Sequence, residues 1–317
     1  MPRSARGPSG LSRSNQALQS PSLSSRTPSL NHRIARFYDA SSPLWLDVWG
    51  DHMHHGYYGI DGRREKPRRE AQLDLIDELI DFAHLPDRVP ARILDAGCGV
   101  GGSARYLAGY FAARVLGVTL SGVQAARGRA YAEAEGCAHL VDIQRRDVYA
   151  GDEPGGFDVV WSLESAEHMP DKARLLGHFY RQLRPGGTLA LVTWCHREEP
   201  PALRAGERRR LRRIGELYHL PPWVPLSRYV EAAGEAGFAE IRTADWSRAV
   251  APFWGEVIRS ALTLRGAAGL LRSGLGTLAG AYAMRHMRAG FADGSIRFVA
   301  LTARKPVLAE ASQKPTA

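Results

Sequence analysis

A glycine-rich loop at residues 95–102 is the part of the sequence that most clearly bears chemistry. It reads DAGCGVGG and lies between a short strand pattern and a helix pattern. Glycines in such a turn let the backbone approach a ligand closely, and the start of the helix offers amide donors. Gly97, Gly99 and Gly102 also satisfy G-x-G-x-x-G, the dinucleotide fingerprint. The loop therefore predicts a cofactor site.

The residues around the loop depart from a dinucleotide site. A nicotinamide site expects an acid about 20 residues further on, at the end of the second strand, where it holds ribose hydroxyls. Here that strand pattern ends Thr119-Leu120-Ser121 without an acid, whereas Asp95 precedes the glycines. A dinucleotide site is therefore only the minor alternative.

Two carboxylates and a histidine follow the fourth strand pattern. Glu164, Glu167 and His168 lie in SLESAEHMPD, and the carboxyl end of a strand in a doubly wound sheet faces the cofactor crevice. Histidine can act as a general base near neutral pH. We expect His168, beside Glu167, to accept a proton, and Glu164 to approach the cofactor or the acceptor. The alternative is that Glu167 and His168 cap or brace the following helix.

A second polar cluster lies at residues 51–55 (DHMHH), just before two tyrosines. Three histidines suggest a metal, but adjacent His54 and His55 cannot readily bind the same ion as His52, and no other ligand spacing supports one. We therefore expect no metal. The segment instead predicts a lid that closes over the cofactor, and core packing of its aromatic residues is the alternative.

Strand and helix patterns alternate from residue 92 onward, which is typical of a doubly wound α/β sheet. The expected strands are 92–96, 115–120, 139–145, 157–163, 188–194, 240–244 and 295–303. The expected helices are 70–83, one starting at about 102, 121–135, 171–183, 197–218, 229–237 and 253–290. We expect a Rossmann-like sheet with helical cap insertions.

Composition indicates a globular body with a distinct N-terminal segment. The chain has 317 residues, 44% of them hydrophobic, and a formal net charge of +9. Residues 1–32 contain four arginines and no Lys, Asp or Glu, so the remainder carries only +5. This segment predicts a disordered tail or a transit-like peptide. We expect one domain over 33–306 and a disordered tail at 307–317, with three cysteines that are reduced thiols.

Several segments resemble the γ-tocopherol methyltransferase family. They are FYDASSPLWLDVWGDHMHHGYYG, ILDAGCGVGG, GVTLSGVQAARG, VVWSLESAEHMPDK, LVTWCHRE, ADWSRAVAPFWGEVIRSAL and IRFVALTARKP, and they span roughly residues 34–306. LDAGCGVGG resembles the first motif of S-adenosylmethionine-dependent methyltransferases. Indole-alkaloid N-methyltransferases are similar in nearly all of these segments. An N- or O-methyltransferase for an indole alkaloid or another aromatic metabolite is therefore the alternative.

The resemblance implies a class I methyltransferase fold and S-adenosylmethionine as cofactor. The first, second and third motifs would lie at about 92–102, 155–163 and 182–191. An acid after the third strand would recognise adenine, although Asp147 alone fits a turn equally well. The cofactor residues implied are Asp95, Gly97, Cys98, Gly99, Gly101, Thr119, Leu120, Ser121, Gln124, Asp147 and Val148.

The resemblance also implies methylation of a ring carbon of γ- or δ-tocopherol, as in vitamin E biosynthesis. A phenol ring becomes a carbon nucleophile as its hydroxyl loses the proton, so a base must reach that hydroxyl. The substrate and lid residues expected are Asp51, His52, His55, Tyr57, Trp246 and Trp254, with Trp223 and Phe253 beside them.

The expected partner is a hydrophobic aromatic small molecule and not nucleic acid. The basic run at 204–213 could bind a duplex, but no stacking platform accompanies it. Helix 266–290 suits a packed lid or a contact with an anionic membrane surface.

The chain would lie in a plastid if residues 1–32 are a transit peptide, and otherwise in the cytoplasm or at a membrane surface. The intact loop disfavours a catalytically silent fold, and the sequence does not define the oligomeric state.

Overall fold

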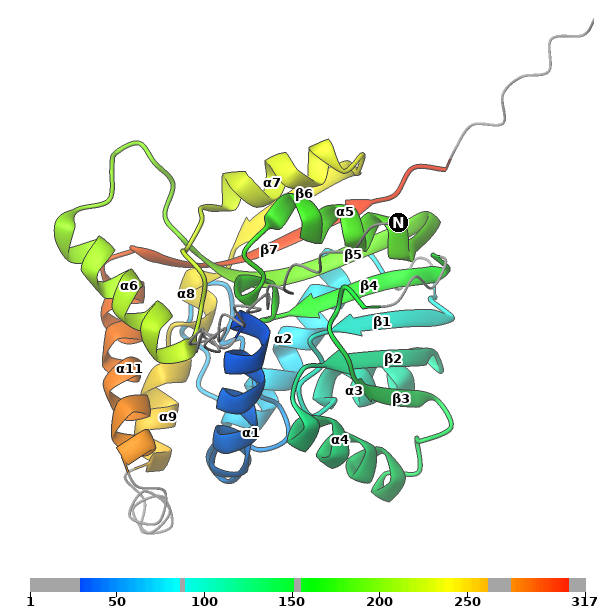
Figure 1. The fold of residues 1–317 in the computed structure, drawn as a ribbon, viewed down its shortest axis with the longest axis horizontal. Coiled ribbons are helices and arrows are strands. Elements are labelled where there is room, and N and C mark those ends of the chain that lie inside the picture. Colours follow the sequence, from blue (N-terminus) through cyan, green and yellow to red (C-terminus); the bar gives the residue numbers. More distant parts are fainter. Residues whose placement is uncertain (1–28, 86–88, 151–154, 262–274, 308–317) are drawn as a thin grey trace, which may run out of the picture.

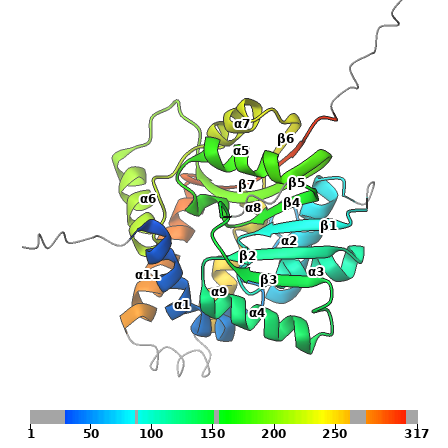
Figure 2. The ribbon, with the colours of Figure 1, turned by 45° about the vertical axis from the view of Figure 1, so that its right-hand side comes forward.

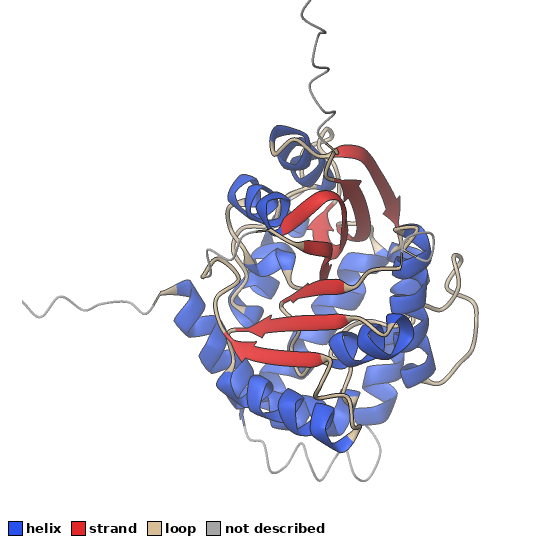
Figure 3. Ribbon diagram, turned by 90° about the vertical axis from the view of Figure 1, so that its right-hand side faces the viewer, coloured by secondary structure: helices blue, strands red, loops and turns tan. Residues whose placement is uncertain are grey.

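A seven-stranded sheet forms the centre of the molecule, with helices on both of its faces (Figures 1 and 3). The computed structural model describes residues 29–85, 89–150, 155–261 and 275–307. The strand order is β3-β2-β1-β4-β5-β7-β6. The strands are β1 (Arg92–Ala96), β2 (Arg114–Thr119), β3 (Val141–Arg145), β4 (Phe157–Leu163), β5 (Leu183–His196), β6 (Ala239–Asp245) and β7 (Ile296–Arg304).

The strand order places a crevice between β1 and β4. The first five strands pair in parallel, and β7 runs antiparallel between β5 and β6. The chain leaves β1 toward β2 and β3 and then returns to add β4 on the other side of β1. Ligands of doubly wound sheets bind at such a reversal, outside the carboxyl ends of the strands. The predicted fold class is confirmed.

Helices precede, connect and cover these strands. They are α1 (Leu30–Trp49), α2 (Arg68–Phe82), α3 (Gly102–Phe111), α4 (Gly122–Ala134), α5 (Lys172–Gln182), α6 (Ala205–Tyr218), α7 (Leu226–Glu235), α8 (Ser247–Val250), α9 (Phe253–Ala261) and α11 (Leu275–Ala292), with a 3₁₀ turn η2 (Ala166–His168). The helix predicted over 253–290 corresponds to α9 and α11, and residues 262–274 lie outside the described residues.

Helix α1 begins inside the segment predicted to be a tail. Ser29 caps it by accepting a hydrogen bond from the backbone N–H of His32 at 3.3 Å. The helix continues through Pro43 to Trp49. Residues 30–32 are therefore helical, which corrects the predicted boundary at residue 32. Apolar or aromatic residues recur along one side at Leu30, Ile34 and Tyr38, the four-residue spacing of an amphipathic helix.

Three apolar cores hold the layers together. One lies between the sheet and α2, α3, α4 and α8, and a second lies between the sheet and α5 and α7. Ile93 faces the first core and Leu94 the second, as the two-residue period of a strand requires. The third core joins α1, α6, α9 and α11 into a helical cap (Figure 2). The site lies between this cap and the sheet.

Among the described residues, no helix is both long enough and apolar enough to span a bilayer.

Candidate active site

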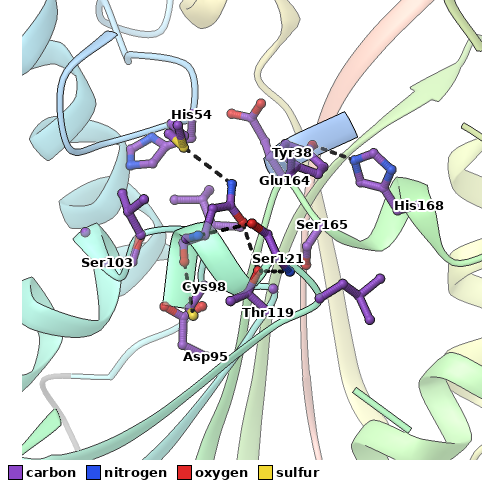
Figure 4. Close-up of a pocket in the computed structure, with 18 of the residues that line it drawn as sticks. Tyr38, His54, Asp95, Cys98, Ser103, Thr119, Ser121, Glu164, Ser165 and His168 are labelled. Atoms are coloured by element: carbon purple, nitrogen blue, oxygen red, sulfur yellow. Dashed lines mark hydrogen bonds between the residues drawn. The ribbon is translucent and has the colours of Figure 1, made fainter. Parts of the chain in front are cut away.

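A cavity opens at the carboxyl ends of β1, β2 and β4, where the strand order reverses (Figure 4). Its volume is about 120 Å³, whereas ligand sites usually measure about 300–1,000 Å³. Ile34 and Tyr38 of α1 form part of its wall. Helix α1 therefore closes the cavity, and a ligand of nucleotide size requires α1 to move outward.

The glycine loop fits tightly between two other segments. Gly97 has a φ of +91°, and a Cβ there would lie 2.3 Å from Cβ of Ser165. A Cβ on Gly102 would lie 2.5 Å from the carbonyl oxygen of Asp51. Gly99 is different, because a Cβ there would meet nothing within 4 Å. The loop thus closes against these two segments at Gly97 and Gly102 and faces open space at Gly99.

Asp95 lies at the base of this loop as a buried acid. Its carboxylate receives a backbone hydrogen bond from Ala104, while Oδ2 has no partner among the described residues. Burial raises the pKa of Asp95 to about 7. An unsatisfied buried oxygen in a cavity wall is suited to a cationic or hydrogen-bond-donating ligand.

The end of β2 presents a hydroxyl and amide network. Thr119 donates from Oγ1 to Oε1 of Gln124 at 2.8 Å, and Ser121 caps α4 by accepting from the Gln124 N–H at 3.0 Å. The Ser121 hydroxyl donates to Asp39 of α1 at 2.5 Å, and the Val123 N–H donates to the same carboxylate at 3.1 Å. The sequence has no acid at the end of the second strand, and Asp39 of α1 supplies a carboxylate at this place in the structure.

Glu164 ends β4 in a strained conformation. Its φ is +52°, a region that non-glycine residues rarely occupy. The carboxylate accepts from the backbone N–H of His55 at 2.6 Å and lies 2.8 Å from Nδ1 of His55. Nε2 of His55 is buried and has no partner among the described residues. This pair joins the histidine segment to the carboxyl end of β4.

His168 contacts a phenol within the cavity wall. Its Nε2 lies 2.9 Å from the hydroxyl of Tyr38 (Figure 4). Burial, and secondly the nearby positive charge of Lys172, lower the pKa of His168 to about 4. Burial also raises the pKa of Tyr38 well above its usual value, as do Glu167 and Glu164. At neutral pH the imidazole is uncharged and Tyr38 keeps its proton.

Glu167 points away from the cavity into the protein. Its Oε2 accepts from the hydroxyl of Thr193 on β5 at 2.9 Å. Burial raises the pKa of Glu167 to about 8, with the charge of Glu164 as the second cause. Lys172 donates to the backbone carbonyls of Ala166 at 2.7 Å and of Met169 at 2.5 Å. Glu167 and Lys172 therefore hold the turn that presents His168.

The histidine segment packs against the glycine loop. Nδ1 of His52 lies 3.2 Å from Nε2 of His54, and Gln72 of α2 donates to the backbone carbonyls of both residues. Burial lowers the pKa of His52 to about 4 and that of His54 to about 3. Asp51 pairs with Arg105 of α3 at 2.7 Å. In the part of the chain that the structure describes, no group of three His, Cys, Asp or Glu residues is placed to hold a metal.

Comparisons with known proteins place this geometry in a family. Residues 67–241 match the family model described as a methyltransferase domain. The chain is 45% identical over 287 residues to a probable tocopherol O-methyltransferase, chloroplastic, of Oryza sativa subsp. japonica, covering 88% of this chain and 79% of that protein. It is 42% identical over 294 residues to the tocopherol O-methyltransferase, chloroplastic, of Arabidopsis thaliana, covering 89% and 84%. The chain belongs to the tocopherol methyltransferase family.

A solved structure agrees with this assignment at the level of the fold. The crystal structure of the [4+2]-cyclase SpnF superposes with a TM-score of 0.73 at 28% identity, covering 89% of this chain and 98% of that one. A shared fold does not by itself define a reaction. The family assignment does so here: the chain is an S-adenosylmethionine-dependent methyltransferase.

The cavity of this methyltransferase has groups that fit the cofactor. Asp95 offers an unsatisfied oxygen, Gly99 leaves open space, and Ser121 and Gln124 supply polar groups beside them. S-adenosylmethionine carries a positive sulfonium, an ammonium and ribose hydroxyls, so carboxylate and hydroxyl partners are appropriate. The predicted cofactor residues that line the cavity are Asp95, Gly97, Cys98, Gly99, Thr119, Leu120, Ser121 and Gln124.

Three predicted cofactor residues of this methyltransferase lie off the cavity wall. Asp147 accepts from the side-chain amide of Asn31 on α1 and from the Tyr149 N–H. Val148 packs beside the second core. Gly101 adopts a φ of +74° as the residue before α3, where a Cβ would lie 2.2 Å from Cδ1 of Ile143. Gly101 is needed for the turn, and Asp147 has its partners in α1 and in its own turn.

Among the predicted substrate and lid residues, only Asp51 and His52 line the cavity. Tyr57 and Trp246, predicted to lie at the substrate, do not line this cavity. They pack on each other at 5.9 Å in the first core, and Trp246 also contacts Phe82 of α2 at 5.6 Å. Trp254 lies in the cap core, 5.1 Å from the ring of His55. An aromatic residue type does not reveal whether the ring faces a ligand or a core.

Sequence reasoning missed the contribution of α1 to the wall. Ile34, Tyr38, Ser103 and Ser165 all line the cavity. The spacing of residues 30, 34 and 38 is the signal that could have revealed α1, because it matches one face of a helix. Ser165 gave no such signal. Its hydroxyl donates to the carbonyl of Ala96 and so ties the end of β4 to the end of β1.

Proposed function

We propose that this methyltransferase transfers the methyl group of S-adenosylmethionine to a ring carbon of γ- or δ-tocopherol. Two relatives with more than 40% identity are named for tocopherol. The observation that carries the proposal is the buried, uncharged His168 whose Nε2 lies 2.9 Å from a phenol, that of Tyr38. A site that already accommodates one phenol at its base is suited to a phenolic acceptor.

The acceptor hydroxyl takes the place of the Tyr38 hydroxyl at His168. S-adenosylmethionine supplies an electrophilic methyl group. His168 would accept the phenol proton as the ring carbon ortho to the hydroxyl bonds to the methyl carbon, while the bond from that carbon to the sulfonium sulfur breaks and S-adenosylhomocysteine is the leaving group. The ring carbon then loses its own hydrogen as a proton, the oxygen is reprotonated, and aromaticity returns. The net change is one methyl gained and one proton released.

Other groups of the chain orient this step and exclude water. Glu164 places a carboxylate on the cavity wall and is held by His55 from two sides. Helix α1 and the histidine segment cover the cavity, so electrostatic interactions inside it are poorly screened by solvent.

The product identifies the atom that is methylated. Labelled S-adenosylmethionine would be offered in parallel with γ-tocopherol, δ-tocopherol and an indoline amine. We expect label in the two tocopherols, in products that keep a free phenol by mass spectrometry and NMR. A methyl ether product would mean that the enzyme methylates the phenol oxygen and not a ring carbon. Label in the amine alone would overturn tocopherol as the acceptor.

We further propose a plastid location with contact at a membrane surface. Both relatives are named chloroplastic, and residues 1–32 are rich in Arg and Ser and free of acids. Tocopherol partitions into lipid, so its methyltransferase must meet it at a bilayer. Residues 1–32 fused to a fluorescent protein should direct it into isolated chloroplasts, and exclusion of the fusion would leave the cytoplasm as the location.

A further inference from the structure

We propose that a second cavity, between α1 and α6, holds the isoprenoid tail of the acceptor. This inference rests on the proposed function, because it assigns a place to the part of tocopherol that does not react. The second cavity has a volume of about 480 Å³, against about 120 Å³ for the cavity at the glycine loop. Its size falls in the range of about 300–1,000 Å³ that is usual for ligand sites.

The lining of this cavity is suited to hydrocarbon. Its apolar residues come from the start of α1, from α6 and from the loop after α6, and they include Leu30, Leu211, Leu220, Pro221 and Trp223. Three exposed arginines also line it, Arg33, Arg208 and Arg212, and their aliphatic stems add apolar surface. A flexible saturated chain needs apolar surface, which these residues offer beside the polar lining residues His196, Glu216 and His219.

Helix α1 is the wall between the two cavities. Ile34 and Tyr38 line the cavity at the glycine loop, whereas Leu30 and Arg33 line the second one. Phe37 follows Arg33 by four residues and contacts the ring of His219, another lining residue of the second cavity, at 5.5 Å. Helix α1 therefore borders both cavities: its first turn reaches the second cavity, and Ile34 and Tyr38, further along the helix, reach the cavity at the glycine loop.

A single layer of aromatic rings joins the reacting end to the second cavity. Trp194 lies 5.7 Å from the ring of His55, which is bonded to Glu164. On its other side, Trp194 stacks on Trp223 at 6.2 Å with an interplanar angle of 13°. Tyr218 contacts both Phe37 and Trp194. An aromatic acceptor ring can pack in this layer with its hydroxyl directed toward His168.

The chemistry of a chromanol matches this path. Its hydroxyl and its ring ether oxygen lie para to each other, and the tail leaves from the carbon beside the ether oxygen. With the hydroxyl at His168, the tail therefore points away from the cofactor. The indole N–H groups of Trp194 and Trp223 are buried and have no partner among the described residues.

Gly215 of α6 allows the cavity to be filled without disturbing the reacting groups. It lines the second cavity, and a Cβ there would meet only ordinary contacts, the nearest being the Leu220 carbonyl oxygen at 3.4 Å and Trp223 Nε1 at 3.8 Å. Gly215→Leu places a side chain in the space assigned to the tail. Gly206→Leu is the matched control on the same helix, since Gly206 is exposed and a Cβ there meets nothing within 4 Å.

The test compares γ-tocopherol with the same chromanol carrying a methyl group in place of the tail. For Gly215→Leu we expect kcat/KM on γ-tocopherol to fall about tenfold through KM, as when roughly two methylene groups lose their buried contacts. Activity on the tail-less chromanol and affinity for S-adenosylhomocysteine should stay within twofold of wild type. Gly206→Leu should behave as wild type on both substrates. Equal losses on both substrates, or no loss on γ-tocopherol, would overturn the tail site.

Failure of the proposed function gives a different result. If the wild type methylates neither chromanol, that function is wrong, and the cavity is then tested by phytol alone through quenching of tryptophan fluorescence. Quenching that Gly215→Leu weakens about tenfold, and Gly206→Leu does not, supports a hydrocarbon site. Absence of quenching, or equal quenching in all three proteins, removes it.

Discussion

Burial sets the protonation states of the groups around the cavity. Desolvation is the largest cause that lowers the pKa of His168 to about 4 and raises the pKa of Glu167 to about 8. At neutral pH the histidine is therefore unprotonated, whereas the glutamic acid carries a proton. Of these two neighbours only His168 can accept a proton from the substrate.

Replacing the base should separate turnover from cofactor binding. We expect His168→Ala to lower kcat about 100-fold or more, the usual contribution of a general base, with affinity for S-adenosylhomocysteine nearly unchanged by calorimetry. Glu167→Gln is the control. Because Glu167 is neutral and accepts from Thr193, an amide should keep most of kcat. An unchanged kcat in His168→Ala would remove it from the mechanism.

Asp95 should make cofactor binding depend on pH. Its pKa in the free protein is about 7, so below pH 7 the carboxyl is protonated and cannot pair with the ammonium of the cofactor. A bound cation lowers this pKa, and binding then releases a proton. Affinity for S-adenosylhomocysteine should rise as pH increases toward 7, by up to about tenfold per unit, and level off above it. Calorimetry of Asp95→Asn should show weaker binding at pH 8 and little dependence on pH; a wild-type affinity that is flat from pH 5 to 8 would contradict this role.

At the scale of elements, α1 is held down at three places along its length. Asn31 donates to Asp147, Tyr38 contacts His168, and Asp39 accepts from Ser121 and from the N–H of Val123. Each partner belongs to the loops at the carboxyl ends of the strands. Opening of the cavity therefore requires these contacts to break together.

Loss of the Asp39 contact should loosen α1. A hydrogen bond to a charged group contributes about 1.5–3 kcal/mol. We therefore expect Asp39→Ala to speed dissociation of S-adenosylhomocysteine about tenfold or more in stopped-flow measurements, and to raise hydrogen exchange in residues 30–49. Arg36→Ala, an exposed position on the same helix, should change neither. Unaltered exchange in Asp39→Ala would mean that this contact does not hold α1.

How well the elements could be predicted depended on local signals. Strands 92–96 and 157–163 match β1 and β4 in both bounds, because apolar runs end there at glycines or charged residues. The direction of Glu167 could not be predicted, since a one-turn 3₁₀ segment turns Glu164 and Glu167 to opposite sides. The packing of Trp246 on Tyr57 could not be predicted either, because this contact joins residues far apart in the sequence. Glycine spacing located the cofactor loop, but tertiary packing decides which aromatic rings face a ligand.

At the scale of the whole molecule, reacting groups and apolar packing are divided between the sheet and the cap. The carboxyl ends of the strands supply the polar groups, and the cap supplies the aromatic layer and the second cavity. Ion pairs within the protein neutralise part of the basic run at 204–213. Arg204 pairs with Glu207, Arg210 with Asp293 and Arg213 with Glu216. The excess positive charge of the sequence thus serves local structure in this helix.

The position of α1 between two cavities also bears on the order in which the reactants arrive. The cofactor must enter beneath Ile34 and Tyr38, which requires α1 to swing outward. A lipid tail lodged against Leu30 and Arg33 would hold down the first turn of the helix. If the acceptor binds first, it bars the cofactor, and abundant lipid then forms a dead-end complex. The same helix that shields the chemistry would make the enzyme subject to inhibition by excess substrate.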